Sequence, residues 1–534
     1  MMTTVRLWAL LWRRRLQSLH SFREQHNNSN VTGYNGANGS NRGVSSNSTS
    51  GNASAGSNAS AMLAIYPAFL AILAFSVAVA ILLTVLGGTH AFIYRASPTH
   101  DLAGALGPHQ GEWIADIPGM TRAQETALAQ IAPTYVMLAL LATVLLAVPI
   151  ITLAGSAARL VTARRDAELS ALRLAGATGT QTLLLSSLDA TAQAFAGAIG
   201  GIIGYFLLLP IISLLRFQNQ RFTFSQLWVG VPTILLVLVT VVVLSLFSSI
   251  ITLSKVVVSP LGVRARSTSD HPGRARFVIF VIALIVAVFT IFVVHSQHQD
   301  TVSAFIGFTI PLIIIFGLIN LVGPAIVRHS ARRELRTART ASSLLAARRL
   351  LDNPKRAWRN VSGVSLAVFV SGICAAGSLF ADGPTGVTGS NAKIRAAEFA
   401  QTVLGHDLGL GGTLTLVFAA VLAACSSGIM QAGNVYDQQE EYRELILEGA
   451  DSRVLSRARL IEVMRPLSAV IVVPVVCVAL LLIPAIGTSF LTAPGVILRF
   501  VAGIGLCFAL MWLGVFGADR AAARLGVKSA RPDD

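Results

Sequence analysis

The sequence is poor in charged residues, which make up 12% of its 534 residues. That is about half of the roughly 25% typical of soluble domains. Hydrophobic residues make up 54%, and the mean hydropathy is +0.67. A soluble protein with this composition would have too little polar surface to cover its core. The composition therefore excludes an ordinary soluble domain and indicates a membrane protein.

Lysine and cysteine are also scarce. Only four of the 41 basic residues are lysines, and none of them follows a glycine. An ATP-binding P-loop needs a Gly-Lys-Ser/Thr corner, because the lysine must reach the phosphates, so none is encoded here. The cysteines form no CxxC pair and lie in apolar runs, which predicts neither a disulfide framework nor a zinc site. They are Cys374, Cys425, Cys477 and Cys507.

The sequence is rich in long apolar runs. A helix needs about 20 mostly apolar residues to cross the hydrocarbon core of a membrane. Ten segments qualify, which predicts an all-α polytopic membrane protein with ten transmembrane helices. They are 63–87, 134–158, 183–214, 228–253, 277–295, 303–327, 360–381, 409–432, 464–488 and 497–518.

The basic residues predict how these helices are oriented. Seven of the 41 fall on one side of the ten spans, and the remaining 34 fall on the other. Because cytoplasmic loops are enriched in Lys and Arg, both termini are expected in the cytoplasm. This also explains the net charge of +16 without a nucleic-acid partner. The basic segment 328–359 suits attraction to anionic lipids, with contact to a protein partner as the alternative.

Two segments outside the spans have distinct compositions. Residues 1–23 suit an amphipathic helix at the membrane surface, with Trp8 and Trp12 on one side. Residues 24–60 are rich in Asn, Ser and Gly and are expected to be a disordered linker. The first external loop, 88–133, holds His and acidic residues whose spacing matches no compact ligand pattern, so no metal site is expected. They are His90, His100, Asp101, His109, Glu112 and Asp116.

The chain contains an internal repeat. A shift of 273 residues aligns 122–189 with 395–462 without a gap, with 14 identities in 68 positions. The predicted first repeat is 61–266 and the second is 358–534, each with one span followed by three. The second repeat has a short external loop at 382–408. Residues 267–357 join the repeats and hold two further spans. An even number of intervening spans makes the repeats parallel, related by an axis along the membrane normal.

Each repeat has a short charged segment on the predicted cytoplasmic side. Residues 163–175 suit a helix that Gly176 ends at its C′ position, and 436–448 have the same layout before Gly449. Two short helices at this face are what a membrane domain would present to a soluble partner. Solvated turns are the simpler alternative.

These features resemble the FtsX-like permeases of ABC transporters, which include MacB-, LolC- and BceB-type subunits. The resemblance rests on an Arg-rich segment with a Glu that leads into Leu-x-x-x-Gly-Ala and then a long span beginning near an acid. In the first repeat these residues are Arg164, Arg165, Glu168, Leu172, Gly176, Ala177 and Asp189. In the second they are Glu441, Leu445, Gly449, Ala450 and Glu462, while Asp437-Gln438 replaces the Arg pair.

The resemblance implies a function and partners. Segments 163–175 and 436–448 would be coupling helices that dock onto a separate ABC ATPase, two copies per permease chain, which binds ATP and Mg²⁺. The permease chain would be a monomer in the bacterial cytoplasmic membrane and would itself be no enzyme. It would drive the export or extraction of an amphiphile such as a lipid, lipopeptide or antimicrobial peptide.

Further residues carry alternative interpretations. Asp189 and Glu462 are expected near helix starts, where the macrodipole stabilises an acid, or in salt bridges to the coupling helices. Gly197, Gly200, Gly201 and Gly204 form two overlapping GxxxG pairs, which favour close helix packing over a sliding surface. Two other functions stay open. One is a relay that transmits motion without transport. The other is an ion-coupled transporter, which the scarcity of ionisable residues in the spans disfavours.

Overall fold

The computed structural model describes residues 50–97, 121–163, 178–258, 301–382, 392–437, 451–486 and 494–529, with a few isolated residues and short runs between these ranges. The expected helix 1–23 lies outside the described residues, as does most of 267–300. The described chain is almost entirely helical. One departure from the all-α expectation is a two-residue antiparallel pairing of β1 (Arg216–Phe217) with β2 (Gln220–Arg221).

The helices occur in the order expected from the apolar runs. They are α2 (Ser50–Ala96), α4 (Arg122–Ala163), α6 (Gly179–Ser213), α7 (Phe224–Leu227), α8 (Gly230–Val258), α10 (Thr301–Thr337), α11 (Ala341–Asp352), α12 (Pro354–Asp382), α13 (Ala392–Asp437), α15 (Ser452–Ile486) and α17 (Pro494–Ser529). Prolines lie inside several of them, for example Pro311 and Pro324 in α10. Neighbouring helices can satisfy the backbone groups that such prolines free.

Eight of the described helices are long and apolar enough to cross a membrane. They match eight of the ten expected spans, so this is the architecture of a multi-pass membrane protein. The expected span 360–381 lies in α12, where the apolar stretch is shorter, Val361–Ile373. The expected span 277–295 falls mostly outside the described residues.

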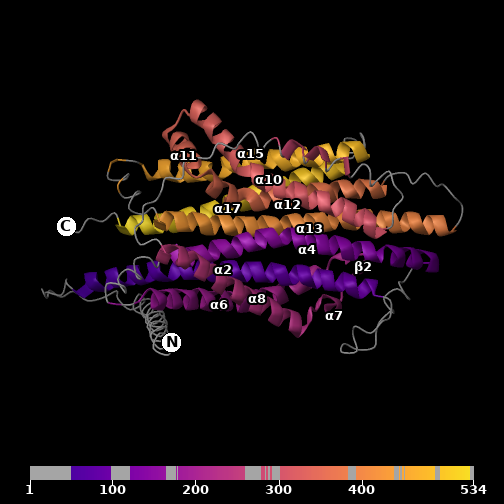
Figure 1. Ribbon diagram of the computed structural model, residues 1–534, viewed down its shortest axis with the longest axis horizontal. Coiled ribbons are helices and arrows are strands. Elements are labelled where there is room, and N and C mark those ends of the chain that lie inside the picture. The colour runs from indigo at the N-terminus through magenta and orange to yellow at the C-terminus, as the bar shows by residue number, and fades with distance from the viewer. Residues whose placement is uncertain are drawn as a thin grey trace, which may run out of the picture.

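The helices form an elongated bundle with two sides (Figure 1). Helices α2, α4, α6 and α8 lie on one side, and α10, α12, α13, α15 and α17 lie on the other. Helix α4 packs along α13 where the two sides meet. The hairpin and α7 lie at one end of the bundle, and α11 lies toward the other (Figure 1).

One apolar core runs through both sides. It includes Leu146 of α4, Val364 of α12, Leu422 of α13 and Leu467 of α15, each at most 2% exposed. Many other core members are alanines, which let helices approach closely. Large apolar side chains also face outward, as at Leu236 and Phe247 of α8. An outward apolar face is what lipid contact requires of a spanning helix.

Several helices are longer than hydropathy predicted. Helix α2 runs to Ala96, α4 begins at Arg122 and α13 begins at Ala392, so much of the expected loops 88–133 and 382–408 is helical. Helix α2 also begins at Ser50, inside the expected linker 24–60. Hydropathy detects only the apolar part of a helix, whereas Ala, Gln, Glu and Arg continue it into water.

The extended helices project beyond the apolar layer. The 46 residues of α13 span about 69 Å at 1.5 Å per residue, against about 30 Å for a hydrocarbon core. The parts of the expected external loops that these helices include are therefore helical. His90, expected in such a loop, lies in α2 with its Nδ1 2.9 Å from the Gln226 carbonyl oxygen.

Candidate functional site

Two glycines with the same backbone conformation lie before the two equivalent helices α6 and α15. Gly176 has φ +94° and Gly449 has φ +93°. A Cβ at either position would meet no atom within 4 Å, so space does not require glycine there. The left-handed φ does, because an L-residue there places Cβ too close to the carbonyl oxygen. The expectation of a left-handed stop at both positions agrees with these angles.

The helices that follow the two glycines also match. Thr178 caps α6: its Oγ1 accepts from the Gln181 N–H at 3.4 Å, and Gln181 Oε1 accepts from the Thr178 N–H at 3.1 Å. At the equivalent position before α15, Asp451 Oδ1 accepts from the Arg453 N–H at 3.0 Å. Helices α6 and α15 begin at Gly179 and Ser452, which are also 273 residues apart. A left-handed glycine and a side-chain cap two residues later thus define the same turn twice.

The segments before these turns are only partly described. The Glu448 N–H donates to the Glu444 carbonyl at 2.9 Å, a helical hydrogen bond directly before Gly449. The other residues expected to contact an ATPase lie outside the described residues, so their positions stay predictions. They are Arg164, Arg165, Glu168, Leu172, Ala177, Glu441, Leu445 and Ala450.

The two acids expected at helix starts lie deeper in their helices. Asp189 is the eleventh residue of α6, and Glu462 is the eleventh of α15. The macrodipole acts mainly within the first turn, so that explanation is wrong for both. The expectation placed each helix start at the first apolar residue, whereas α6 and α15 begin at Gly179 and Ser452, ten residues before their acids. Asp189 is 1% exposed, and its Oδ2 accepts from Gln193 Nε2 at 2.9 Å.

The four glycines of α6 face α2. A Cβ at Gly200 would lie 2.5 Å from Ser76 Oγ, and one at Gly201 would lie 2.5 Å from Val79 Cβ. A Cβ at Gly197 would collide with Phe75, and one at Gly204 would come within 2.9 Å of Ala80 Cβ. Glycine is therefore required here because α6 and α2 lie so close together.

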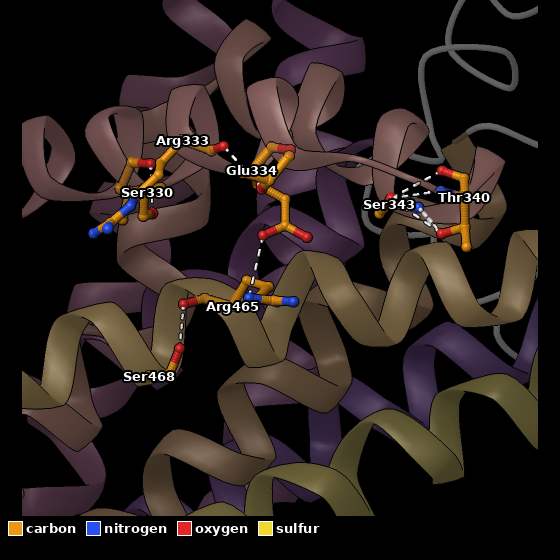
Figure 2. A network of polar contacts seen from close by, with 9 residues as sticks. Ser330, Arg333, Glu334, Thr340, Ser343, Arg465 and Ser468 are labelled. Carbon is orange, nitrogen blue, oxygen red and sulfur yellow. Dashed lines mark hydrogen bonds and ion pairs between the residues drawn. The ribbon is translucent and has the colours of Figure 1, made fainter.

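A second contact region surrounds α11, in the segment expected to be basic. Figure 2 shows Glu334 of α10 facing Arg465 of α15, with Glu334 Oε2 3.2 Å from Arg465 Nη1. Thr340 caps α11 through Ser343, whose N–H donates to Thr340 Oγ1 at 3.3 Å. Trp358 of α12 covers Gly323 of α10, where a Cβ would overlap the indole. These contacts fix α10, α11, α12 and α15 as one unit.

A buried polar cluster occupies the end of the bundle where α7 lies, and the sequence analysis did not predict it. Its centre is Arg95, which is 1% exposed. The guanidinium donates to the carbonyl oxygens of Phe217 at 2.8 Å and Arg221 at 3.0 Å. It also donates to Gln226 Oε1 at 3.0 and 3.2 Å, and it lies 4.4 Å from the centre of the Phe222 ring. Arg95 thus binds the hairpin and α7 to the end of α2.

Asp407 of α13 completes this cluster from the other side of the bundle. It is 4% exposed, and its Oδ2 accepts from the Tyr135 hydroxyl at 2.7 Å and from the Gln218 N–H at 2.6 Å. Gln218 and Asn219 have φ of 55° and 63° and form the tight turn of the hairpin. Gln218 Oε1 also accepts from Arg95 Nη1 at 3.3 Å, so one residue contacts both charged groups.

The sequence carried only a weak signal for this cluster. Arg95 follows an apolar run, and an arginine in that position most often only helps to determine the topology of the span. Asp407 stood in an expected loop. The pairing depends on a two-residue turn with positive φ at Gln218, a residue type that rarely adopts it.

Among the described residues, no group of three or more His, Cys, Asp or Glu could hold a metal ion. Cys425, Cys477 and Cys507 are free thiols. Comparison of the chain with models of protein families, and with curated protein sequences, gives no match.

Proposed function

We propose that this protein is the permease subunit of an ABC transporter of the FtsX-like kind, driven by a separate ATPase. The observation that carries this proposal is the doubled turn at Gly176 and Gly449. Two similar turns, each a left-handed glycine followed by a side-chain cap and a long helix, suit two copies of one partner. ABC ATPases act as face-to-face dimers, and each monomer needs one docking segment.

The helix contacts support two parallel repeats of four spans within a ten-span chain. Helix α2 packs on α4 and α6, and α12 packs on their equivalents α13 and α15. Helix α4 packs on its own equivalent α13, and the crossed pairs α2–α13 and α12–α4 are also in contact. This reciprocity is the pattern expected around a two-fold axis along the membrane normal. The spans 277–295 and 303–327 then lie between the repeats.

The described geometry suggests how motion would be transmitted. A docking segment that ends at Gly176 acts on α6 through the turn capped by Thr178. The close contact of α6 with α2 at Gly197 and Gly201 favours movement of the two helices together. A displacement at the ATPase would therefore move α6 and α2 together. In the second repeat the close contact has its glycine on α12, the equivalent of α2, rather than on α15, the equivalent of α6. A Cβ at Gly372 of α12 would lie 2.9 Å from the methyl groups of Val478 of α15.

The sequence supports a separate ATP-binding partner. No lysine follows a glycine, so ATP and Mg²⁺ would be bound by the ATPase, two copies for one permease chain. The excess of basic residues on one side of the spans favours cytoplasmic termini, and the resemblance implies a bacterial cytoplasmic membrane. The substrate class implied by the resemblance is an amphiphile, exported or extracted from the membrane.

One observation favours a second candidate function, a relay that transmits ATPase motion to an external partner without transport. Helices α4 and α13 project beyond the apolar layer at the end where α7 lies, and Arg122 begins one of these projections. Such paired helices offer an external protein a rigid surface.

The test is purification of the chain from its native membrane, with and without the ATPase that accompanies it. The complex should hydrolyse ATP, and the isolated chain should not. Reconstitution in vesicles then separates the two candidates, since a permease moves a labelled amphiphile between leaflets or out of the vesicle and a relay does not. Appreciable hydrolysis by the isolated chain would overturn the proposal.

A further inference from the structure

The two sides of the bundle meet through different chemistry along their length. Between α4 and α13 the contact is apolar, with Leu146 and Leu422 both in the shared core. At the end where α7 lies, a single carboxylate on α13 accepts hydrogen bonds from two groups on the first side, the Tyr135 hydroxyl and the Gln218 N–H. Apolar helix faces can separate or slide without leaving polar groups unpaired, whereas the Asp407 contact cannot open without losing both bonds at once.

The position of this carboxylate is close to the repeat axis. Tyr135 and Asp407 are 272 residues apart, one short of the repeat offset, so they occupy nearly equivalent turns of α4 and α13. The glycine turn at Gly176 precedes α6, and the hairpin that Asp407 binds follows it. The 35 residues of α6 place these two features about 52 Å apart.

Two features of the Asp407 contact favour its opening. Gln218 Nε2 is buried without a hydrogen-bond partner among the described residues, which destabilises the closed arrangement, since water would satisfy this group once the end opened. His406, adjacent to Asp407 and with its side chain 67% exposed, lies with Nδ1 3.7 Å from Asp407 Oδ1. Solvent therefore already reaches the neighbouring side chain. The hydrogen bonds that Arg95 donates to Phe217, Arg221 and Gln226 lie within the first side of the bundle.

We propose that Asp407, Tyr135 and the Gln218 amide form a releasable contact that holds the two sides of the bundle together at the end opposite Gly176. It opens when the two sides separate. The inference rests on the proposed function in one respect, since it assigns the motion of the transport cycle to these two sides. Asp407 is a positioning residue here, and no substrate contact is assigned to it.

The test uses the full chain in lipid nanodiscs with its four cysteines replaced by alanine. Spin labels at Arg216→Cys and Thr402→Cys, both exposed, report the distance between the hairpin and α13. Asp407→Asn should broaden the distance distribution and add a longer component. The matched control is Thr143→Val, which removes the 3.0 Å Thr89–Thr143 bond within the first side and should leave the distribution unchanged.

A second measurement keeps the inference falsifiable if Asp407→Asn does not fold. Amide hydrogen exchange at Gln218 should become about tenfold faster in Tyr135→Phe, because loss of one hydrogen bond to a charged group shifts an opening equilibrium by about that factor. It should not change in Thr143→Val. Unchanged distances in Asp407→Asn, or unchanged exchange in Tyr135→Phe, would overturn the proposal. Neither measurement needs an ATPase, so either result stands whether or not the chain is a permease subunit.

Discussion

Gly176 and Gly449 lie 273 residues apart and have φ values within one degree of each other. Each is followed two residues later by a side chain that caps the next helix, Thr178 before α6 and Asp451 before α15. The matched glycines and caps support the proposed repeat at the position where an ATPase is proposed to dock.

Substituting these glycines should impair assembly with the ATPase. A β-branched residue at a left-handed position costs about 1–2 kcal/mol, so Gly176→Val and Gly449→Val should each displace the docking segment before the turn. The measurement is the amount of ATPase recovered with the tagged chain. Gly317→Val is the control, because a Cβ there also meets nothing within 4 Å and its φ is ordinary. Equal recovery in all three variants would mean that the turns are incidental.

Overpacking the α2–α6 contact should destabilise the bundle. Gly201→Val would place its Cβ 2.5 Å from Val79 Cβ and 2.8 Å from the Ser76 carbonyl oxygen, and overpacking typically costs about 1–3 kcal/mol. The thermal midpoint in detergent should fall clearly. Gly505→Val introduces the same side chain into open space on α17 and should change the midpoint little. Similar midpoints for the two variants would contradict the close contact of α2 and α6.

The α10–α12–α15 unit should depend on Trp358 far more than on the ion pair shown in Figure 2. Trp358 is 5% exposed and donates from Nε1 to Asn320 Oδ1 at 3.3 Å, so Trp358→Ala should cost about 3–5 kcal/mol. Arg465 is 59% exposed although Glu334 is only 14% exposed, and an ion pair with one partner open to solvent typically contributes about 1 kcal/mol or less, so Glu334→Gln should be mild. Thermal unfolding compares the two. Trp512→Ala, at a tryptophan 46% exposed, is the control and should also be mild.

Much of the fold follows from local sequence. Hydropathy located the spans because lipid selects apolar runs, and the glycine pattern of α6 indicated a close helix contact because only glycine permits it. Helix ends outside the membrane were harder, since caps such as Thr178 and polar helix formers such as those after Arg122 carry no hydropathy signal. The Arg95–Gln218–Asp407 cluster could not be predicted, because it joins residues from three segments that meet only after the bundle has formed.

The composition of the purified complex tests the central claim most directly, because the two proposed docking turns in one chain predict two ATPase subunits. Native mass spectrometry of the complex solubilised from its own membrane should show one copy of this chain with two copies of the ATPase. The chain alone, recovered without any ATPase, would contradict the proposed function. A dominant species with two permease chains would contradict the assignment of both docking turns to one chain.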